Sequence, residues 1–502
     1  MPLLLGLDVG SSSVKAALVD ADSGTVFAHG VSPAHELPIT APKPGWAEQD
    51  PEIWWKHTKK AIRLLARDSG ADLSRVQAVG ISYQMHGLVI VDDTPAVIRP
   101  AIIWCDSRAA SIGKKAFHDI GPSVCLSRLL NSPGNFTASK LAWIRENEPD
   151  AFSRISKFML PGDYIAHLLT GEITTTPSGL SEGVLWDFSQ NKVADLVLEH
   201  YEIPLELLPR LVPTFSIQGN ITRQAAAELG LPTDAVVSYR AGDQPNNAFS
   251  LGVCEPGEVA ATAGTSGVVY GVGDRAVFDG ASRVNTFVHV NHAPDAPRYG
   301  VLLCVNGTGI LNSWLKHTVM STGEVTVDYP EMNDLACEVP VGSDGLLVFP
   351  FGNGAERTLG DKNPGAMIHG LNFNIHDRRH LLRASQEGIV FALKHGVDIM
   401  QEMGLVIRTV RAGRANMFLS PLFREAFTNT INTRLELYNT DGSVGAARGA
   451  GVGAGIYPSL TDAFSGLSTE MVLEPDNALV SSYAAYYDRW LDELEHYLSM
   501  LD

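Results

Sequence analysis

The chain has 502 residues, of which 45% are hydrophobic and 19% are charged, a composition typical of a globular protein with two or more domains. Its formal net charge of −18 excludes nucleic acid and anionic membranes as general partners, because no basic surface is available to collect phosphates. The five scattered cysteines exclude a disulfide framework, and since no apolar run reaches the roughly 18 residues of a membrane helix, we expect a cytoplasmic protein.

A β-hairpin is predicted at the start of the chain, with strands over residues 3–7 and 14–19. The turn between them is Asp8-Val9-Gly10-Ser11-Ser12-Ser13. Gly10 lets the backbone approach an anion, the serine hydroxyls and exposed amides can donate to phosphate oxygens, and Asp8 can hold a hydrated magnesium ion. These features suit a nucleoside triphosphate, although an ordinary serine-rich hairpin has the same pattern.

Strands and helices alternate through the rest of the first half, which indicates α/β layers. Helices are predicted over residues 52–68, with Asp50 as the N-cap, and over 139–146. The predicted strands span residues 76–82, 88–91 and 101–104. Two of these strands are followed by polar segments, Gln84-Met85-His86-Gly87 and Trp104-Cys105-Asp106-Ser107-Arg108. Polar groups beside an aromatic ring suit a polyhydroxylated sugar, whereas a lone histidine or tryptophan is more often structural.

Asp243 is the candidate catalytic residue, because it follows the apolar strand predicted over residues 235–239. Its carboxylate would face a cleft at the domain boundary, which we place near residues 239–251. There an aspartate can accept the proton of a hydroxyl group during phosphoryl transfer. The same residue can instead cap a helix, because Pro245 follows at a position compatible with the first turn.

A second hairpin lies about half a chain length after the first, over residues 258–270. Its turn contains Gly264 and Thr265, so it repeats the arrangement of strand, glycine and hydroxyl, and strand. The repeat indicates two related halves that each place one hairpin at a shared cleft, where together they could grip one triphosphate. Neither turn is a Walker A loop and no Gly-x-Gly-x-x-Gly follows the first strand, which argues against P-loop and Rossmann folds.

The rest of the second half continues the α/β pattern. Strands are predicted around residues 268, 301 and 346, and amphipathic helices over residues 378–403 and 481–502. The glycine-rich segment 442–451 either packs a helix closely on a sheet or admits an adenine ring, and close packing is the simpler interpretation.

The chain resembles the FGGY family of carbohydrate kinases over nearly its whole length. The motifs that carry this resemblance are Gly45-Trp46-Ala47-Glu48-Gln49-Asp50-Pro51, Trp54-Trp55, Gln84-Met85-His86-Gly87, Trp104-x-Asp106-x-Arg108, Lys140-Leu141-x-Trp143, Asp163-Tyr164 and Gly242-Asp243. The resemblance implies an α/β, actin-like ATPase fold in which two ribonuclease H-like domains, residues 1–245 and 246–502, close around a central cleft. It also implies ATP and Mg²⁺ as cofactors and a small sugar as the other substrate.

The resemblance further implies a role for each candidate site residue. Asp243 is the catalytic base. The sugar site is expected to contain Met85, His86, Trp104, Asp106, Asp243 and Gln244. The phosphates and the metal are expected to lie among Asp8, Ser11, Ser12, Lys15, Gly264 and Thr265, with Asp8 as the metal residue. The nucleoside is expected beside Gly309, Ala412, Gly413 and Asn416.

The expected reaction is phosphorylation of the terminal hydroxyl of a ketopentose, D-xylulose to D-xylulose 5-phosphate, because Gln84-Met85-His86-Gly87 is most like the xylulose-phosphorylating members. The xylulose-phosphorylating members usually have a glycine-rich loop near the adenine, and residues 411–420 of this chain depart from it. Those members also usually have asparagine where this chain has Gln244. Both features look more like glycerol kinases. Ribulose, a deoxyketose, an alditol or glycerol therefore stay open as substrates, and so does a non-catalytic sugar or nucleotide sensor. A homodimer is one open oligomeric state.

Overall fold

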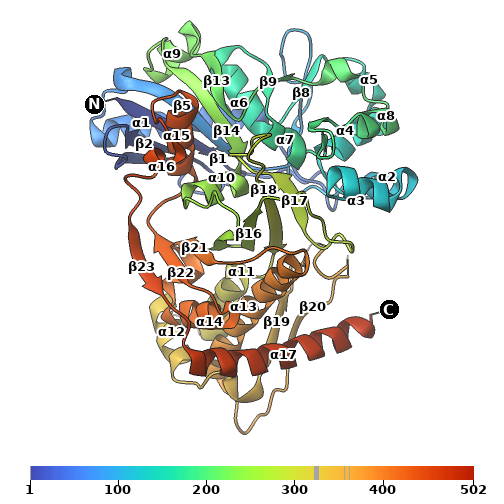
Figure 1. The fold of residues 1–502 in the computed structure, drawn as a ribbon, viewed down its shortest axis with the longest axis vertical. Coiled ribbons are helices and arrows are strands. Elements are labelled where there is room, and N and C mark those ends of the chain that lie inside the picture. The colour runs from blue at the N-terminus through green and yellow to red at the C-terminus, as the bar shows by residue number, and fades with distance from the viewer. Residues whose placement is uncertain (1, 322–326, 356, 361, 502) are drawn as a thin grey trace.

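Two mixed β-sheets, one from each half of the chain, form the framework of the computed structural model, which describes residues 2–321, 327–355, 357–360 and 362–501 (Figure 1). The first sheet has the order β13-β14-β5-β1-β2-β3. Its strands are β1 (Leu3–Val9), β2 (Val14–Asp20), β3 (Val26–Ser32), β5 (Val76–Tyr83), β13 (Phe215–Asn220) and β14 (Val236–Gly242). β1, β2 and β3 are antiparallel neighbours, whereas β5 is parallel to both β1 and β14.

The second sheet repeats this arrangement. Its order is β17-β18-β16-β15-β21-β22-β23, so β18, β16 and β15 correspond to β3, β2 and β1. Its strands are β15 (Glu258–Ala263), β16 (Gly267–Gly273), β17 (Asn285–Val288), β18 (Tyr299–Val305), β21 (Thr409–Gly413), β22 (Leu435–Tyr438) and β23 (Thr469–Leu473). β21 and β22 run parallel to β15, and β23 returns antiparallel as β13 does. The strand order confirms the predicted α/β class and the duplication of the two hairpins.

The predicted helices of the first half form with small changes of length. α1 (Pro51–Ser69) begins where Asp50 accepts a hydrogen bond from the backbone N–H of Glu52, and it ends at Gly70 in the left-handed conformation. Its buried face, which includes Trp54 and Leu65, packs on β2 and β3. α6 (Pro161–Thr170) packs on β5 and β14, and α9 (Arg223–Leu229) packs against α1 and α6.

A helical region extends from the first sheet on the right of Figure 1. It contains α2 (Ala110–Ile120), α3 (Pro122–Leu129), α4 (Thr137–Asn147), α5 (Pro149–Phe152), α7 (Pro177–Glu182) and α8 (Asp195–His200). Eight short strands form separate two-stranded sheets in this half: β4 (Glu48–Gln49) with β7 (Ala101–Ile102), β6 (Val89–Val91) with β8 (Lys157–Met159), β9 (Thr174–Thr175) with β12 (Arg210–Leu211), and β10 (Trp186–Asp187) with β11 (Lys192–Val193).

The second half has its own helical layer. Its helices are α11 (Gly309–Trp314), α12 (Tyr329–Cys337), α13 (Arg378–Glu402), α14 (Pro421–Ile431) and α17 (Asn477–Ser499), and β19 (Leu347–Phe351) pairs with β20 (Gly365–His369). The short α16 (Leu460–Ala463) instead packs against α15 beside the first sheet (Figure 1). α13 is almost entirely buried, and Trp490 of α17 packs against Phe349 and Phe391 while its indole N–H donates to the Val348 carbonyl at 3.0 Å. No helix in the described ranges is long and apolar enough to cross a membrane.

Two helices cross between the halves. α10 (Asp243–Ser250) follows β14 and contacts β14 and β5 of the first sheet as well as β15 and β16 of the second. α15 (Gly442–Gly453) follows β22 but lies on β1, β5 and β14, where Figure 1 shows it among the blue strands. The side chain of Asn246 donates to the Gly442 carbonyl at 2.8 Å, and the Ser238 hydroxyl donates to the Ala450 carbonyl at 2.8 Å. The close-packing interpretation of residues 442–451 is therefore confirmed.

The approach of α15 to the first sheet predicts a large effect of Gly80→Ala. A Cβ atom at Gly80 would lie 1.9 Å from the Ala446 carbonyl oxygen, so we expect overpacking to cost about 1–3 kcal/mol of stability. Chemical denaturation of this variant should show a lower midpoint than the wild type. The control is Gly280→Ala, because no atom lies within 4 Å of the Cβ position at Gly280. Equal midpoints for the two variants would contradict the close approach.

Candidate active site

Asp8 lies at the end of β1, where both halves of the chain reach it. The Ser82 hydroxyl donates to one carboxylate oxygen at 2.9 Å, and a Cβ atom at Gly442 would lie 2.9 Å from the other. Burial raises the pKa of Asp8, Lys15 on the paired strand lowers it, and the nearby Asp441 carboxylate raises it again. Asp8 thus lies where the first turn of α15 meets the first sheet.

The first hydroxyl turn connects β1 to β2. The Gly10 amide donates to the Ser13 carbonyl at 3.0 Å, and this bond closes the turn. Ser12 is exposed and Ser11 half-buried, so both can meet a ligand. The indole N–H of Trp104 donates to the Ser11 hydroxyl at 3.2 Å, and Trp104 is 44% exposed. The structure therefore joins Trp104, expected in the sugar site, to the phosphate turn.

Asp243 is the first residue of α10, directly after β14. Gly242 occupies the N-cap position without a side-chain hydrogen bond, so Asp243 is not the cap of this helix. Burial raises the pKa of Asp243 to about 7, and the negative charge of Asp8 adds to this shift, whereas hydrogen bonds from Gln244 oppose it. The structure brings Asp8, Asp243 and Gln244 together at the junction of the halves.

The Asp8 carboxylate fits a divalent cation that also binds phosphate oxygens. The negative charge of Asp8 raises the pKa of Asp243, and a cation beside Asp8 would relieve part of that repulsion. Magnesium sites in phosphoryl-transfer enzymes use one or two carboxylates and complete their shell with phosphate and water. The described residues contain no cluster of three or more His, Cys, Asp or Glu side chains that could hold a metal ion.

The second hydroxyl turn connects β15 to β16 and meets two other segments. The Gly309 amide donates to the Gly264 carbonyl at 2.8 Å, and the Ile310 amide donates to the Thr265 carbonyl at 3.3 Å. The side-chain amide nitrogen of Asn416 lies 3.4 Å from the Cβ position at Gly264. Thr265 and Asn416 are both exposed. The structure thus brings Gly264, Thr265, Gly309 and Asn416 together, as the resemblance implies.

The adjoining surface contains apolar residues that sequence reasoning missed. Ile310 and Trp314 on α11 are 37% and 50% exposed, and Leu419, three residues after Asn416, is 57% exposed. Large exposed apolar side chains beside a phosphate turn suit a purine ring. Ala412 is fully buried on β21, so only its backbone can reach a ligand, whereas the neighbouring Gly413 is half-buried.

His86 follows β5 in a conformation that is unusual for a residue with a Cβ atom. Its φ of 60° lies in the left-handed region, which costs a residue other than glycine about 1–2 kcal/mol. Its Nδ1 lies 2.8 Å from the Glu182 carbonyl, which can only accept, so Nδ1 carries the proton and Nε2 is free to accept. Burial lowers the pKa of His86 to about 3, and the Lys140 charge adds to the shift, so the ring is neutral.

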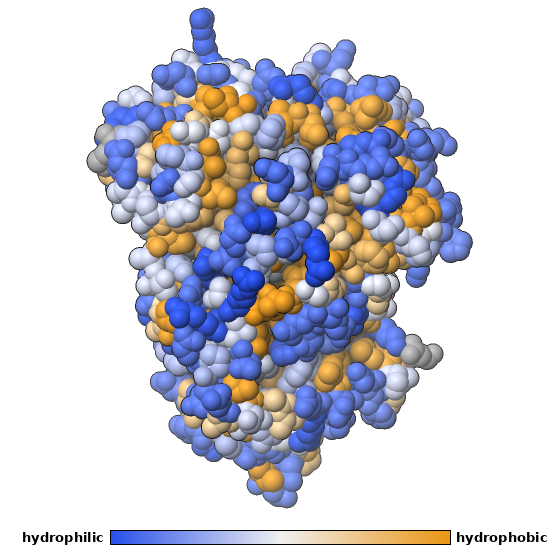
Figure 2. Space-filling model, viewed as in Figure 1, coloured by the Kyte–Doolittle hydropathy of each residue, from blue (hydrophilic) through white to orange (hydrophobic). Residues whose placement is uncertain are grey.

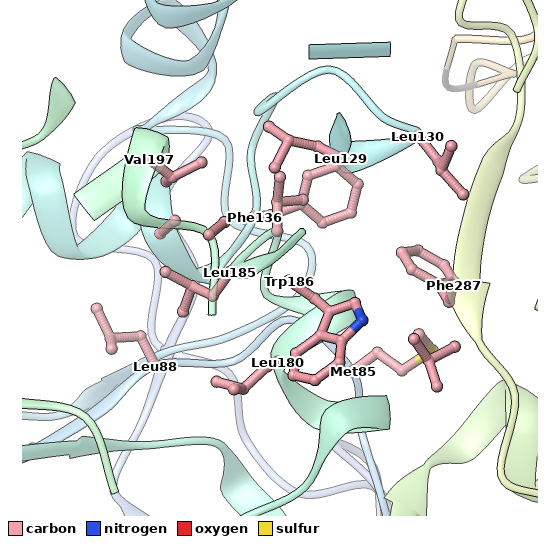
Figure 3. Close-up of a cluster of buried hydrophobic side chains, with 14 of the residues drawn as sticks. Met85, Leu88, Leu129, Leu130, Phe136, Leu180, Leu185, Trp186, Val197 and Phe287 are labelled. Atoms are coloured by element: carbon pink, nitrogen blue, oxygen red, sulfur yellow. The ribbon is translucent and has the colours of Figure 1, made fainter. Parts of the chain in front are cut away.

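The second half supplies part of the wall around His86. Phe287 of β17 lies 5.6 Å from the His86 ring centroid, and Phe136 lies 4.7 Å from it. Figure 3 shows Phe287 extending from its strand toward Met85, which is 4% exposed. The Arg357 guanidinium lies 5.7 Å from the Phe136 ring, and its charge also lowers the pKa of His86. Phe287 lacks any sequence signal, because one phenylalanine in the short strand Asn285-Thr286-Phe287-Val288 is indistinguishable from an ordinary core residue.

The structure places Asp106 away from the open surface. Its carboxylate is fully buried, accepts hydrogen bonds from the Arg108 side chain at 2.7–3.0 Å, and also accepts one from the Ala47 amide at 2.6 Å. The Arg108 guanidinium in turn lies 3.8 Å from the Trp46 ring centroid. In this arrangement Asp106 orders the loop after β7 and presents no open oxygen to a sugar.

Glu182 at the end of α7 is a further acidic residue that the sequence did not reveal. It is 1% exposed, and a Cβ atom at Gly242 would lie 2.4 Å from its Oε2 atom. Burial raises the pKa of Glu182 well above its usual value, Tyr83 lowers it, and Asp243 raises it. A glutamate in a Ser-Glu-Gly sequence is typical of a surface turn, so the local sequence does not predict its burial beside Asp243.

Polar side chains gather where the two halves meet. Figure 2 shows hydrophilic residues along the middle of this face around a small hydrophobic area, between the upper and lower parts of the molecule. Such a mixture of polar and apolar groups suits a cleft that binds a charged and partly apolar ligand.

Comparison with known proteins agrees with this geometry. Residues 3–250 match the N-terminal domain of the FGGY family of carbohydrate kinases. The chain is 31% identical to the xylulose kinase of Staphylococcus epidermidis over 97% of this chain and 95% of that protein. Two crystal structures have the same fold. The structure of a xyloylose kinase from Brucella ovis matches with 28% sequence identity and a TM-score of 0.89 over all of both chains. The structure of xylulose kinase from Rhodospirillum rubrum matches with 27% identity and a TM-score of 0.88 over 99% of this chain and 100% of that one. The chain therefore belongs to the FGGY family of carbohydrate kinases, whose actin-like ATPase fold it has.

Proposed function

We propose that the protein transfers the γ-phosphoryl group of ATP to the terminal hydroxyl of D-xylulose, giving D-xylulose 5-phosphate. The observation that carries the proposal is the Asp8–Asp243 carboxylate pair at the junction of the halves, where a Cβ atom at Gly242 would lie 2.6 Å from the side chain of Met85. The names of the similar proteins support the choice of sugar.

Asp243 acts as the general base in this proposal. A carboxylate with a pKa of about 7 is a stronger base than an ordinary aspartate, yet it is ionised in about half of the molecules at pH 7. It takes the proton of the attacking hydroxyl as the oxygen bonds to phosphorus, while the bond to the ADP oxygen breaks. Its place at the start of a short, packed helix holds the carboxylate in one position.

The two hydroxyl turns hold the triphosphate. Ser11, Ser12 and Thr265 donate from their hydroxyls and amides, and Lys15 adds positive charge beside Asp8. Gly309, Gly413 and Asn416 flank the nucleoside, with Trp314 as an apolar wall. Asp8 would hold Mg²⁺, and a bound ion would supply positive charge that offsets the negative charge developing on the transferred group.

The sugar lies between Met85, His86 and Gln244 in this proposal, with Trp104 at the entrance. The unprotonated Nε2 of His86 accepts a hydrogen bond from a sugar hydroxyl, and the buried Phe287 packs against the His86 ring and supports it. We propose that residues 1–245 and 246–502 are the two domains, and that α10 and α15 form the hinge about which they close. Closure excludes water, so that the sugar hydroxyl reacts instead.

A panel of acceptors tests the reaction and its base. ADP release with Mg²⁺ and ATP should be greatest with D-xylulose among xylulose, ribulose, their enantiomers, deoxyketoses, pentitols and glycerol. Asp243→Asn should lower turnover at least about a hundredfold without a comparable loss of ATP or sugar binding. Asp295→Asn, at an exposed position, is the control. Preference for another acceptor would replace xylulose, and absence of release with every acceptor would favour a sensor.

The raised pKa of Asp243 predicts the pH dependence of the reaction. Because the carboxylate is the active form, kcat/KM for the sugar should rise with pH and level off above about pH 7. In Asp243→Asn the residual rate should lack this rise. Initial rates between pH 5.5 and 8.5 measure both, and a wild-type profile that is flat down to pH 5.5 would argue against Asp243 as the base.

Replacement of His86 tests the sugar site separately from the nucleotide site. His86→Ala should raise the KM for the sugar about tenfold or more and leave the KM for ATP nearly unchanged, because Nε2 loses its hydrogen bond to a hydroxyl. His118→Ala is the matched control, since the His118 side chain is 90% exposed. If sugar kinetics are unchanged in His86→Ala, the residue does not contact the sugar.

A further inference from the structure

Lys140 is a fully buried lysine that connects two loops of the candidate sugar site. It lies on α4, and its Nζ atom donates to the His86 carbonyl at 2.8 Å and to the Ile103 carbonyl at 3.0 Å. His86 belongs to the loop after β5, and Ile103 begins the loop after β7 that carries Trp104. The ammonium group therefore bridges these two loops, next to the backbone hydrogen bonds that join Leu88 and Ile102 at 2.9 and 3.2 Å.

The loop that contains His86 needs such a contact. Its left-handed conformation is strained, and strain of this kind persists only where the surroundings fix the residue at several points. The ring is fixed by the Glu182 carbonyl, and the backbone of His86 is fixed by Lys140. The Ile103 carbonyl also accepts from the Asp106 amide at 3.2 Å, so Lys140 completes the turn that carries Trp104.

Burial of an ammonium group is costly, and here its hydrogen-bond partners are carbonyl oxygens. Burial lowers the pKa of Lys140 to about 7, Asp106, Cys105 and Glu182 raise it, and Arg108 lowers it. The Asp106 carboxylate is itself occupied by Arg108. An apolar side chain would fill the same space without the cost of burying a charge. The ammonium group of Lys140 therefore points to a role in orienting the two carbonyls.

We propose that Lys140 is a positioning residue for the sugar, which holds the backbone of His86 and the loop that carries Trp104 at the spacing that the sugar requires. This inference rests on the proposed function, because it concerns the same sugar site. Lys140 acts through His86 and the loop after β7 and does not itself react.

The test compares Lys140→Met with a matched variant, Lys157→Met. Lys157 also donates to two carbonyls, those of Glu206 and Leu208 at 2.6 and 2.9 Å, but it lies on β8. In Lys140→Met we expect the KM for the sugar to rise at least about tenfold while the KM for ATP changes less than about twofold. Lys157→Met should change neither value. Lys140→Gln, which keeps one donor group, should fall between the wild type and Lys140→Met.

Hydrogen exchange measured by mass spectrometry gives a readout that needs no activity. Peptides that cover residues 84–88 and 103–108 should exchange faster in Lys140→Met, whereas peptides of α17 should not change. A sugar KM within twofold of the wild type, or unchanged exchange in both loops, would overturn the role of Lys140. If the wild type releases no ADP with any sugar, both the proposed function and this inference fail. If the wild type is active and the Lys140 variants have the same sugar KM, only the inference about Lys140 fails.

Discussion

The repulsion between Asp8 and Asp243 is the constraint on which the junction of the two halves depends. Both side chains are half-buried, burial raises the pKa of each carboxyl group, and the negative charge of Asp8 raises the pKa of Asp243 further. The local sequence around either residue does not offset the cost of this repulsion, since Asp8 lies at the end of a strand and Asp243 begins a helix. The pair persists because the surrounding helices and strands fix it, and a catalytic site can use the raised basicity that results.

The crossing of α10 and α15 provides that fixation. α15 follows a strand of the second sheet and packs on the first, whereas α10 follows β14 and contacts strands of both sheets, so the two halves share these helices. Small residues make the crossing close: a Cβ atom at Gly6 would lie 1.8 Å from the Ser443 carbonyl, and one at Gly445 would lie 2.5 Å from the Ser250 Cβ. The same contacts place Gly442 against Asp8, so the close packing of α15 also positions a carboxylate of the candidate active site.

The sequence predicted those parts of the fold that have local causes. The N-cap Asp50, the two glycine-hydroxyl turns and the periodicity of α13 were sufficient to find α1, both hairpins and the long helix within a few residues. Features formed by distant segments had no such cause. The Glu182 carboxyl and Phe287 become part of the site only through tertiary contacts. Asp106 follows a strand, as ligand-binding residues often do, yet its carboxylate accepts hydrogen bonds from the Arg108 side chain. Periodicity and spacing cannot reveal which partner a polar side chain meets.

The wall around His86 suggests how sugar binding and closure are coupled. β17 of the second half is held by side chains of the first: the Asn131 amide group pairs with the backbone of Thr286 at 2.7 and 3.0 Å, and the Ser178 hydroxyl donates to the Val288 carbonyl at 3.1 Å. These contacts carry Phe287 onto the ring of His86. Any rotation of the second half that moved β17 would therefore change the sugar site as well as the nucleotide site. A sugar that binds His86 would favour the arrangement in which Phe287 supports the His86 ring, because a ligand shifts a conformational equilibrium toward the state that binds it better.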